Sequence, residues 1–198
     1  MSKIYTGASV SLDGYIAGPG ESGFEHLFAW YGNGDVEVTT ANPELTMRMT
    51  PENAEHVRTI TDMTGAIVVG RKLFDYTDGW GGRHPMDKPV VVVTHSVPDG
   101  WPRADAPFEF VTDGIEPAIA RARELAGDKG VAVNGGTIAS QCLDAGLLDE
   151  IWVDLVPVVL GGGTPYFSQL GGAPYPVEGP IDIVDGRGVT HLRYRVAR

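Results

Sequence analysis

Short apolar runs, each ended by a glycine or a small polar residue and followed by a helical pattern, recur along this chain and restrict its fold. Three of them, interpreted as strands, are Ala66–Val69, Pro89–Thr94 and Val131–Asn134. Their apolar side chains follow one another without alternation, which is typical of strands that are covered on both faces. Because strands that alternate with helices pair in parallel, the sequence predicts an α/β domain with a mostly parallel sheet.

The two ends of the chain add further strands. Lys3–Val10 is rich in β-branched and aromatic residues and predicts a first strand. Ile181–Val184 and Val189–Val196 flank Asp185-Gly186-Arg187-Gly188, a sequence typical of a β-hairpin. We therefore expect an antiparallel hairpin at the edge of the sheet. Two more strands are predicted over Phe108–Val111 and Glu150–Leu160.

Two helices carry signals at their ends. Thr50-Pro51 predicts a helix start with proline in the first turn, and Gly65 predicts the end of that helix. Asp113 and Glu116 have the spacing of a capping box for a helix over Ile115–Ala126. Shorter helices are predicted over Lys72–Tyr76 and Thr137–Ala145.

The 198 residues contain no linker and no repeat, so we expect one domain over residues 1–198. Gly18–Met49 is long for a plain loop and has poor periodicity. We interpret it as an insertion that forms either a lid or a contact in a homodimer. It carries an apolar cluster that is large for an exposed loop, namely Phe24, Leu27, Phe28, Trp30 and Tyr31.

Composition excludes two classes of partner. Fifteen basic and 26 acidic residues give a formal net charge of −11, and no run of lysine or arginine offers a surface for nucleic acid. The apolar stretches are far shorter than the roughly 20 residues of a membrane span. A single cysteine, Cys142, rules out an internal disulfide and favours a reducing compartment, the cytoplasm. No metal site is predicted.

Three strand ends share the design of a ligand site. They are Val69-Gly70-Arg71-Lys72, Val93-Thr94-His95-Ser96 and Asn134-Gly135-Gly136-Thr137-Ile138. Ligands of open α/β sheets sit at the carboxyl ends of strands, where glycine lets a phosphate approach the backbone. Each run is also compatible with a simple tight turn. Neither a dinucleotide G-x-G-x-x-G nor a P-loop is present.

Several of these residues form motifs of a known family. Ala8–Ala17, with the sequence ASVSLDGYIA, resembles the opening strand of the dihydrofolate reductase superfamily, and Gly70-Arg71-Lys72 resembles its Gly-Arg turn. Asn134-Gly135-Gly136 and the segment Leu143–Gly163, which contains GLLDE and PVVLGGG, are similar to the C-terminal reductase domain of the bacterial riboflavin-biosynthesis deaminase-reductase. The likeness covers residues 3 to about 196 and leaves out only Gly18–Met49.

The resemblance implies a three-layer, dihydrofolate reductase-like fold with a mixed, mainly parallel sheet of about eight strands and a C-terminal β-hairpin. It also implies NADPH as the cofactor. Arg71 resembles the arginine that pairs with the 2′-phosphate, helped by Thr94, His95 or Ser96. Ala8 and Ile16 would flank the nicotinamide ring. The remaining cofactor contacts are assigned to Gly70, Lys72, Asn134, Gly135, Gly136, Thr137 and Ile138.

The chain departs from the superfamily at two points. Leu73 stands where dihydrofolate reductases usually have a threonine near the phosphates. No residue matches the buried carboxylate that holds a pterin, so Asp13, at the end of the first strand, is the candidate catalytic and substrate-binding carboxylate. Its alternative role is a turn former that bonds only to its own backbone. The other predicted substrate contacts are Trp80, Leu160, Gly161 and Phe167. His26 and His56 are interpreted as ordinary helix-face residues.

These features predict a reductase that uses NADPH to transfer hydride to a flat nitrogen heterocycle or its ribosyl adduct. By resemblance, the nearest substrate is the aminopyrimidine precursor of riboflavin. The alternatives are a dihydrofolate or pterin reductase, and a nucleotide-binding protein that has kept the fold without turnover. The expected partners are a small heterocyclic substrate and a second copy of the chain.

Overall fold

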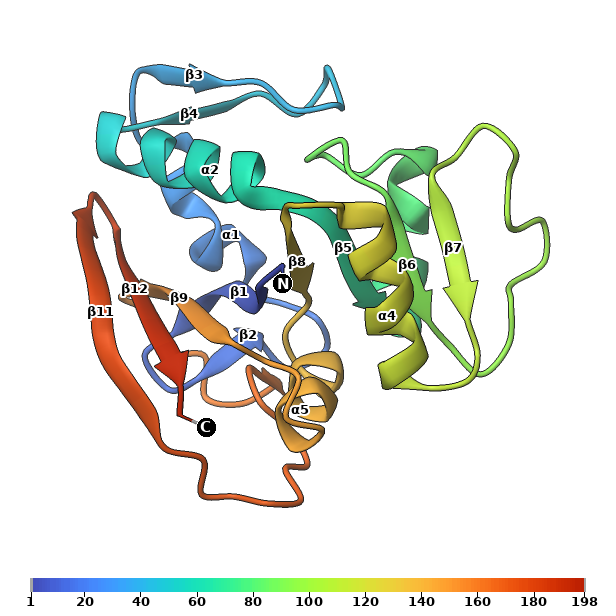
Figure 1. Ribbon diagram of the computed structural model, residues 1–198. Helices are drawn as coiled ribbons and strands as arrows, with labels where there is room; N and C mark the ends of the chain where they lie inside the picture. The colour runs from blue at the N-terminus through green and yellow to red at the C-terminus, as the bar shows by residue number, and fades with distance from the viewer. Residues whose placement is uncertain (1, 198) are drawn as a thin grey trace.

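A computed structural model, which describes residues 2–197, shows a sheet of eight strands at the centre of the chain (Figure 1). The six strands from β9 to β7 run parallel, and β12 and β11 extend the sheet antiparallel. The predicted fold class is confirmed. In sheet order the strands are β11 (Val177–Gly186), β12 (Val189–Val196), β9 (Glu150–Val156), β1 (Ile4–Ser11), β8 (Gly130–Val133), β5 (Thr64–Gly70), β6 (Val90–Val93) and β7 (Phe108–Val111).

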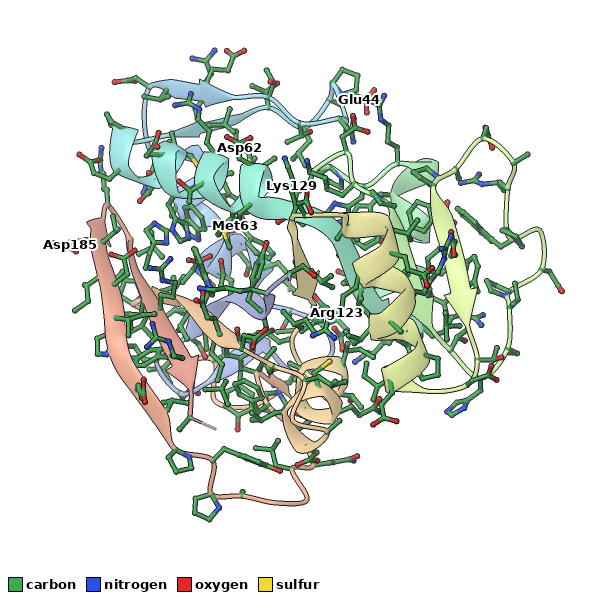
Figure 2. All side chains as sticks on the ribbon, in the orientation of Figure 1. Glu44, Asp62, Met63, Arg123, Lys129 and Asp185 are labelled. Atoms are coloured by element: carbon green, nitrogen blue, oxygen red, sulfur yellow. The ribbon has the colours of Figure 1, made fainter. Side chains whose placement is uncertain are left out.

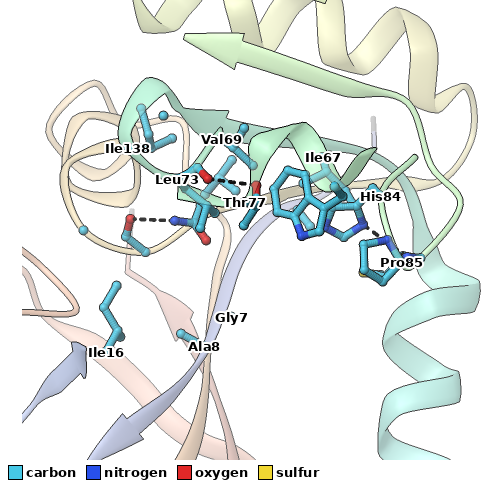
Figure 3. A pocket seen from close by; sticks show the side chains of 18 of the residues that line it. Gly7, Ala8, Ile16, Ile67, Val69, Leu73, Thr77, His84, Pro85 and Ile138 are labelled. Atoms are coloured by element: carbon cyan, nitrogen blue, oxygen red, sulfur yellow. Dashed lines mark hydrogen bonds between the residues drawn. The ribbon is translucent and has the colours of Figure 1, made fainter. Parts of the chain in front are cut away.

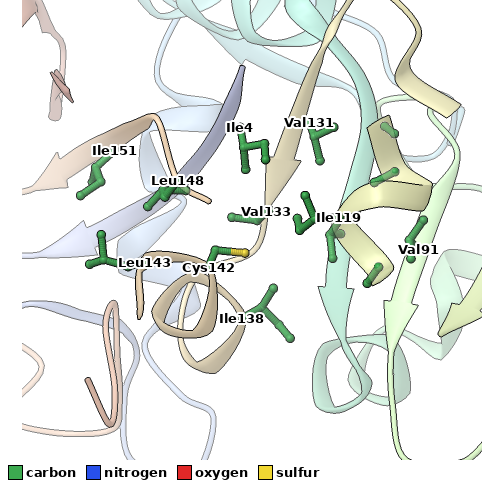
Figure 4. Close-up of a cluster of buried hydrophobic side chains, with 14 of the residues drawn as sticks. Ile4, Val91, Ile119, Val131, Val133, Ile138, Cys142, Leu143, Leu148 and Ile151 are labelled. Atoms are coloured by element: carbon green, nitrogen blue, oxygen red, sulfur yellow. The ribbon is translucent and has the colours of Figure 1, made fainter. Parts of the chain in front are cut away.

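Helices cover both faces of the sheet and complete three layers. α4 (Ile115–Ala126) and α5 (Thr137–Asp144) pack on one face, over the largest apolar core (Figure 4). α2 (Pro51–Met63) and the short α3 (Arg71–Tyr76) cover the opposite face. Among the described residues, no helix combines the length and the apolar character needed to cross a membrane.

Strand β5 shows why the central strands are apolar throughout. Ala66 and Val68 belong to the core under α4 and α5, whereas Ile67 and Val69 contact Phe74 of α3 on the other face. Side chains alternate between the faces of a strand, so burial on both faces leaves no position for a polar residue.

The stretch Gly18–Met49 contains structure of its own. It holds α1 (Phe24–Leu27), a 3-10 turn η1 (Ala29–Gly32) and a two-stranded ribbon of β3 (Val36–Val38) and β4 (Met47–Met49). Leu27 and Trp30 are fully buried in a separate core that includes sheet residues. The ribbon lies beside α2, and Glu44 lies in the loop that joins its strands (Figures 1 and 2). Two members of the predicted apolar cluster, Leu27 and Trp30, are therefore buried within the chain and are not exposed to a partner.

Three shorter elements complete the chain: β2 (Tyr15–Ala17), its antiparallel partner β10 (Thr164–Pro165) and the 3-10 turn η2 (Asp78–Gly82).

Two predicted element ends and one predicted cap differ from the structure, whereas the bounds of α4 are as predicted. Gly65 does not end α2, which stops at Met63; Gly65 lies in β5, where a Cβ would come within 2.5 Å of the Ala126 carbonyl oxygen. Its role is therefore close packing against α4. The capping box does not form either, because Gly114 is the N-cap of α4 and no side chain bonds there. Strand β9 ends at Val156 rather than at residue 160.

Candidate functional site

A cleft of about 1780 Å³ runs along the carboxyl ends of the parallel strands and continues over the sheet face beside α2 (Figure 3). The three strand ends singled out in the sequence meet there. Leu73, Val69 and Ile138 lie along one part of it, and Ile16, Ala8 and Gly7 lie across from them in Figure 3. All predicted cofactor contacts line this cleft: Ala8, Ile16, Gly70, Arg71, Lys72, Thr94, His95, Ser96, Asn134, Gly135, Gly136, Thr137 and Ile138.

Arg71 joins the ends of β5 and β6. Its Nη1 donates to the carbonyl oxygen of Ser96 at 2.8 Å and to Thr94 Oγ1 at 3.4 Å. Its Nε donates to Asp75 Oδ1 at 2.7 Å, one turn along α3. These bonds fix the guanidinium group at the cleft wall while leaving about a third of the side chain exposed (34%). An anion in the cleft therefore meets a held, solvent-accessible cation.

Lys72, the next residue, projects differently. Its ammonium group pairs with the carboxylate of Glu21, and 72% of its side chain is exposed. Lys72 is therefore an exposed charge at the rim of the cleft, in contrast to the held guanidinium of Arg71.

The loop between β8 and α5 brings backbone close to the cleft. Gly136 is the N-cap of α5 with φ 75, a conformation that glycine adopts without strain. A Cβ on Gly135 would lie 3.0 Å from both Ile16 and Tyr166, so a side chain there would crowd the wall. α5 starts at Thr137, and the first N–H groups of a helix have no partner within it. The loop therefore offers backbone donors to an anionic group.

The part of the cleft beside α2 is mostly apolar and aromatic. Its floor is formed by Tyr5, Gly7 and Trp152 from β1 and β9. Phe28 forms a parallel stack with Tyr31 at 5.4 Å between ring centroids and with Phe24 at 5.9 Å. These rings line the cleft of their own chain, so the stretch Gly18–Met49 acts as a wall of this pocket. A flat ring is the ligand shape that such a surface favours.

A buried polar cluster lies on the floor of this aromatic part. His56 Nε2 and His191 Nδ1 both lie within hydrogen-bonding distance of Asp154 Oδ1, at 2.8 and 2.7 Å. The two imidazole rings stack at 3.6 Å, and His191 Nε2 lies 3.1 Å from Asn53 Oδ1. Burial raises the pKa of Asp154, but the two imidazole bonds outweigh it and hold the pKa below its ordinary value. His56 and Asp154 line the cleft.

Sequence reasoning missed this cluster. The sequence predicts His56 to be an ordinary helix-face residue, and no motif singles out Asp154 or His191. The sequence signal is modest: one carboxylate within the otherwise apolar segment IWVDLV of β9, and one histidine in the facing strand. His191 pairs with Asp154 in the register of β12 and β9, which only the sheet order reveals.

Another wall of the cleft carries Trp80, with His84 against its ring at 4.6 Å. The role of Trp80 in substrate binding stays a prediction. Burial lowers the pKa of His84 to about 4, so its imidazole is neutral at physiological pH. Arg83 lines the cleft as well and pairs with the carboxylate of Asp87 at 2.7 Å.

Asp13, Leu160 and Gly161 lie together outside the residues that line the cleft. The Asp13 carboxylate accepts bonds from the backbone N–H groups of Leu160 at 3.0 Å and Gly161 at 2.7 Å. The Ser11 hydroxyl donates to it at 2.6 Å and, with these backbone bonds, lowers the pKa of Asp13 to about 2. Asp13 therefore ties the β1–β2 turn to the glycine-rich loop after β9, rather than only to its own backbone.

Phe167 is also absent from the lining of this cleft, and its ring packs against Tyr166 at 4.7 Å. Its role in substrate binding stays a prediction, as does that of Asp13, Leu160 and Gly161.

Comparisons with known proteins agree with this geometry. The model of the RibD C-terminal domain matches residues 2–174. An uncharacterized protein, YwjB, of Bacillus subtilis (strain 168) is 26% identical over 163 residues, which is 82% of this chain and 80% of that protein.

Solved structures share the fold. A putative riboflavin biosynthesis protein from Shewanella sp. PV-4 superposes with a TM-score of 0.71 at 23% identity and 99% coverage of both chains. RibD of Acinetobacter baumannii has a TM-score of 0.63 at 13% identity, and this chain spans 58% of its length. Dihydrofolate reductase from Enterococcus faecalis, complexed with NADP(H), has a TM-score of 0.58 at 14% identity, with 99% of this chain and 97% of that chain covered.

Proposed function

This chain belongs to the RibD C-terminal domain family, and from that premise we propose that it is an NADPH-dependent reductase acting on a flat nitrogen heterocycle or its ribosyl adduct. The observation that carries the proposal is the cleft itself. A held guanidinium and a glycine-rich loop line one part of it, and parallel aromatic rings line the adjoining part. An anionic ligand in the first part and a flat ring in the second would therefore touch each other inside the cleft.

NADPH fits the residues present. Arg71, Thr94 and Ser96 would hold the 2′-phosphate, and the N-terminus of α5 with Gly135 and Gly136 would take the pyrophosphate. The observation that supports this fit is the donor set: the guanidinium group of Arg71 is held by Ser96 and Thr94 at the cleft wall, and 34% of its side chain stays exposed. When bound, NADPH supplies the hydride.

The protein's own contribution is to position the rings and to limit access of water. Ala8 and Ile16 line the cleft with apolar side chains where the glycine loop meets β1. Gly7, which precedes Ala8 in β1, has no side chain. It leaves the floor of the aromatic part of the cleft open to the second ligand. Holding both reactants in one apolar cleft favours direct transfer between them.

The identity of the heterocycle is a finer proposal. The family points to the ribosylated aminopyrimidine of riboflavin biosynthesis. Within the described part of the chain, the lysines and arginines that line the cleft are Arg71, Lys72 and Arg83, so a phosphoribosyl group would rely on Arg83. Asp154 favours the alternative, a pterin, because it places a carboxylate on the floor of the aromatic part.

The decisive experiment follows protein fluorescence during titration with NADPH and, in parallel, with NADH. We expect tighter binding of NADPH, after which aminopyrimidines, pterins and flavins are compared by the rate of NADPH oxidation. Binding with no oxidation by any of these classes would favour the non-catalytic alternative. Failure to bind either nucleotide would contradict the proposed function.

Phe28→Ala tests the aromatic wall. Phe28 is 40% exposed and stacks with Tyr31 and Phe24, so the variant removes stacking surface with little loss of core. We expect the KM of the heterocycle to rise about 2- to 10-fold, which corresponds to about 0.5–1.5 kcal/mol, with the Kd of NADPH unchanged. Leu12→Ala, at an exposed position (59%) that does not line the cleft, is the control. An unchanged KM would place the heterocycle elsewhere.

Self-association is a separate proposal. We propose that the chain forms a homodimer, and sedimentation at micromolar concentration measures this directly. Ile181 and Ile183 on the edge strand β11 and Phe28 on the cleft wall are exposed apolar side chains available to a second copy. A single monomeric species would contradict the proposal.

A further inference from the structure

The cluster of His56, Asp154 and His191 has a hydrogen-bond pattern that fixes where its protons are. Asn53 Nδ2 donates to the carbonyl oxygen of Arg187 at 3.2 Å, which turns the amide oxygen Oδ1 toward His191. An amide oxygen only accepts hydrogen bonds, so His191 Nε2 must carry a proton. His191 Nδ1 faces Asp154 Oδ1 at 2.7 Å, and an ionised carboxylate also only accepts.

The pattern therefore requires a proton on both ring nitrogens of His191. A His191 ring with a single proton would either leave the Asn53 oxygen without its donor or place an unprotonated ring nitrogen against the Asp154 carboxylate, lone pair to lone pair. Because His191 is 2% exposed, no bulk water replaces the lost bond, and the loss is costly. The cluster is built to hold an imidazolium next to a carboxylate.

Asp154 connects this proton to the cleft. Both imidazoles bond to Oδ1, and within the described part of the chain no hydrogen bond reaches Oδ2. Asp154 and His56 line the cleft, whereas His191 lies behind them. In the register of the sheet, Asp154 pairs with Ser9, the residue next to Ala8.

We propose that His191 stores a proton and that Asp154 passes it to the substrate during reduction. The inference rests on the proposed function. The substrate's C=N bond gains the hydride of NADPH at carbon and this proton at nitrogen, so that an amine and NADP⁺ are formed. His191 Nδ1 gives its proton to Asp154 Oδ1. Rotation of the carboxyl group turns this O–H toward the substrate nitrogen, which takes the same proton, and a proton from the solvent buffer restores the imidazolium of His191.

Asp154 is then a catalytic residue, and His191, Asn53 and His56 are positioning residues. His56 donates from Nε2 to the same oxygen and keeps the carboxylate in place. Other charged or titratable groups face the cluster as well. From neighbouring elements these are Tyr31 and Tyr166, whose pKa values are raised chiefly by burial and also by Asp154, and Arg193, which lies over the Trp152 ring and pairs with Asp182.

The first test needs neither substrate nor cofactor. Protein labelled with ¹⁵N in its histidine rings is examined by NMR at about pH 8, where an ordinary histidine has lost its second proton. We expect both nitrogens of His191 to be protonated in the free protein, and one to become unprotonated in Asp154→Asn. An unprotonated His191 nitrogen in the unaltered protein would overturn the inference, whatever the fate of the proposed function.

A bound metal ion would overturn it as well. One nitrogen from each histidine and a carboxylate oxygen lie within 4.8 Å of one another, which is a donor set for a divalent cation. Elemental analysis of the purified protein is expected to find no stoichiometric metal. Stoichiometric zinc that is lost in Asp154→Asn would assign the cluster to metal binding.

Measurements of kcat and its pH dependence distinguish proton transfer by Asp154 and His191 from a purely structural role of the cluster. We expect Asp154→Asn to lower kcat about 100-fold or more, with the Kd of NADPH unchanged. His191→Gln is expected to make kcat fall as pH rises from about 6 to 8, because solvent must then supply the proton, whereas the unaltered protein shows a flatter profile. His26→Gln, an exposed histidine away from the cleft, is the control. Parallel pH profiles for His191→Gln and the unaltered protein would overturn the storage role.

Discussion

Trp30→Ala is expected to lower the free energy of unfolding by about 3–5 kcal/mol, the usual cost of deleting a large buried aromatic side chain. Trp30 is 1% exposed, and its indole N–H donates to Ser9 Oγ on β1 at 3.0 Å. Its ring also meets His191 edge-on at 5.1 Å between centroids. The variant would therefore leave a cavity and unpair a buried hydroxyl group. Urea unfolding followed by circular dichroism measures the change.

Leu45→Ala is the control for this prediction. Leu45 belongs to the same stretch, residues 18–49, but is 44% exposed. We expect its removal to change the free energy of unfolding by less than about 0.5 kcal/mol. If Trp30→Ala were equally mild, the stretch would be a detachable lid whose contacts with the sheet contribute little, and the cleft wall formed by Phe28 would be mobile.

The parallel sheet and the meeting of three strand ends at the cleft were predictable because their determinants are local. In Val69-Gly70-Arg71, for example, the buried strand, its end and the cation that follows are adjacent in sequence. Parallel pairing of β5, β6 and β8 then brings the three strand ends to one edge of the sheet. No long-range information is needed for that step.

The cluster at Asp154 was not predictable in this way. His56 comes from α2, Asp154 from β9 and His191 from β12, and only the antiparallel addition of β12 beside β9 joins them. Asp13 shows the same limit. Its position after β1 suggested a site, yet its carboxylate is used by backbone N–H groups at Leu160 and Gly161, far along the chain. Side chains whose partners are distant in sequence need the fold before a role can be assigned.

Arg71→Ala is expected to weaken NADPH binding about 10- to 150-fold, equivalent to about 1.5–3 kcal/mol for hydrogen bonds to a charged group. NADH should bind within about twofold of its affinity for the unaltered protein, since it lacks the 2′-phosphate. Fluorescence titration of both nucleotides against both proteins gives the four dissociation constants. The factor by which the substitution raises the Kd of NADPH, divided by the factor by which it raises the Kd of NADH, isolates the contribution of the phosphate.

Arg71 also has a structural role, which gives this prediction a distinct alternative outcome. Its bonds to Ser96 and Thr94 tie β5 to β6, and loss of this link is the one route by which the substitution would weaken both nucleotides alike. Equal weakening of NADPH and NADH would mean that Arg71 acts through the loop rather than on the phosphate. Arg48→Ala, an exposed arginine paired with Glu37 on the β3–β4 ribbon, controls for loss of one positive charge. Selective loss of NADPH in Arg71→Ala alone would assign cofactor choice to this one guanidinium group.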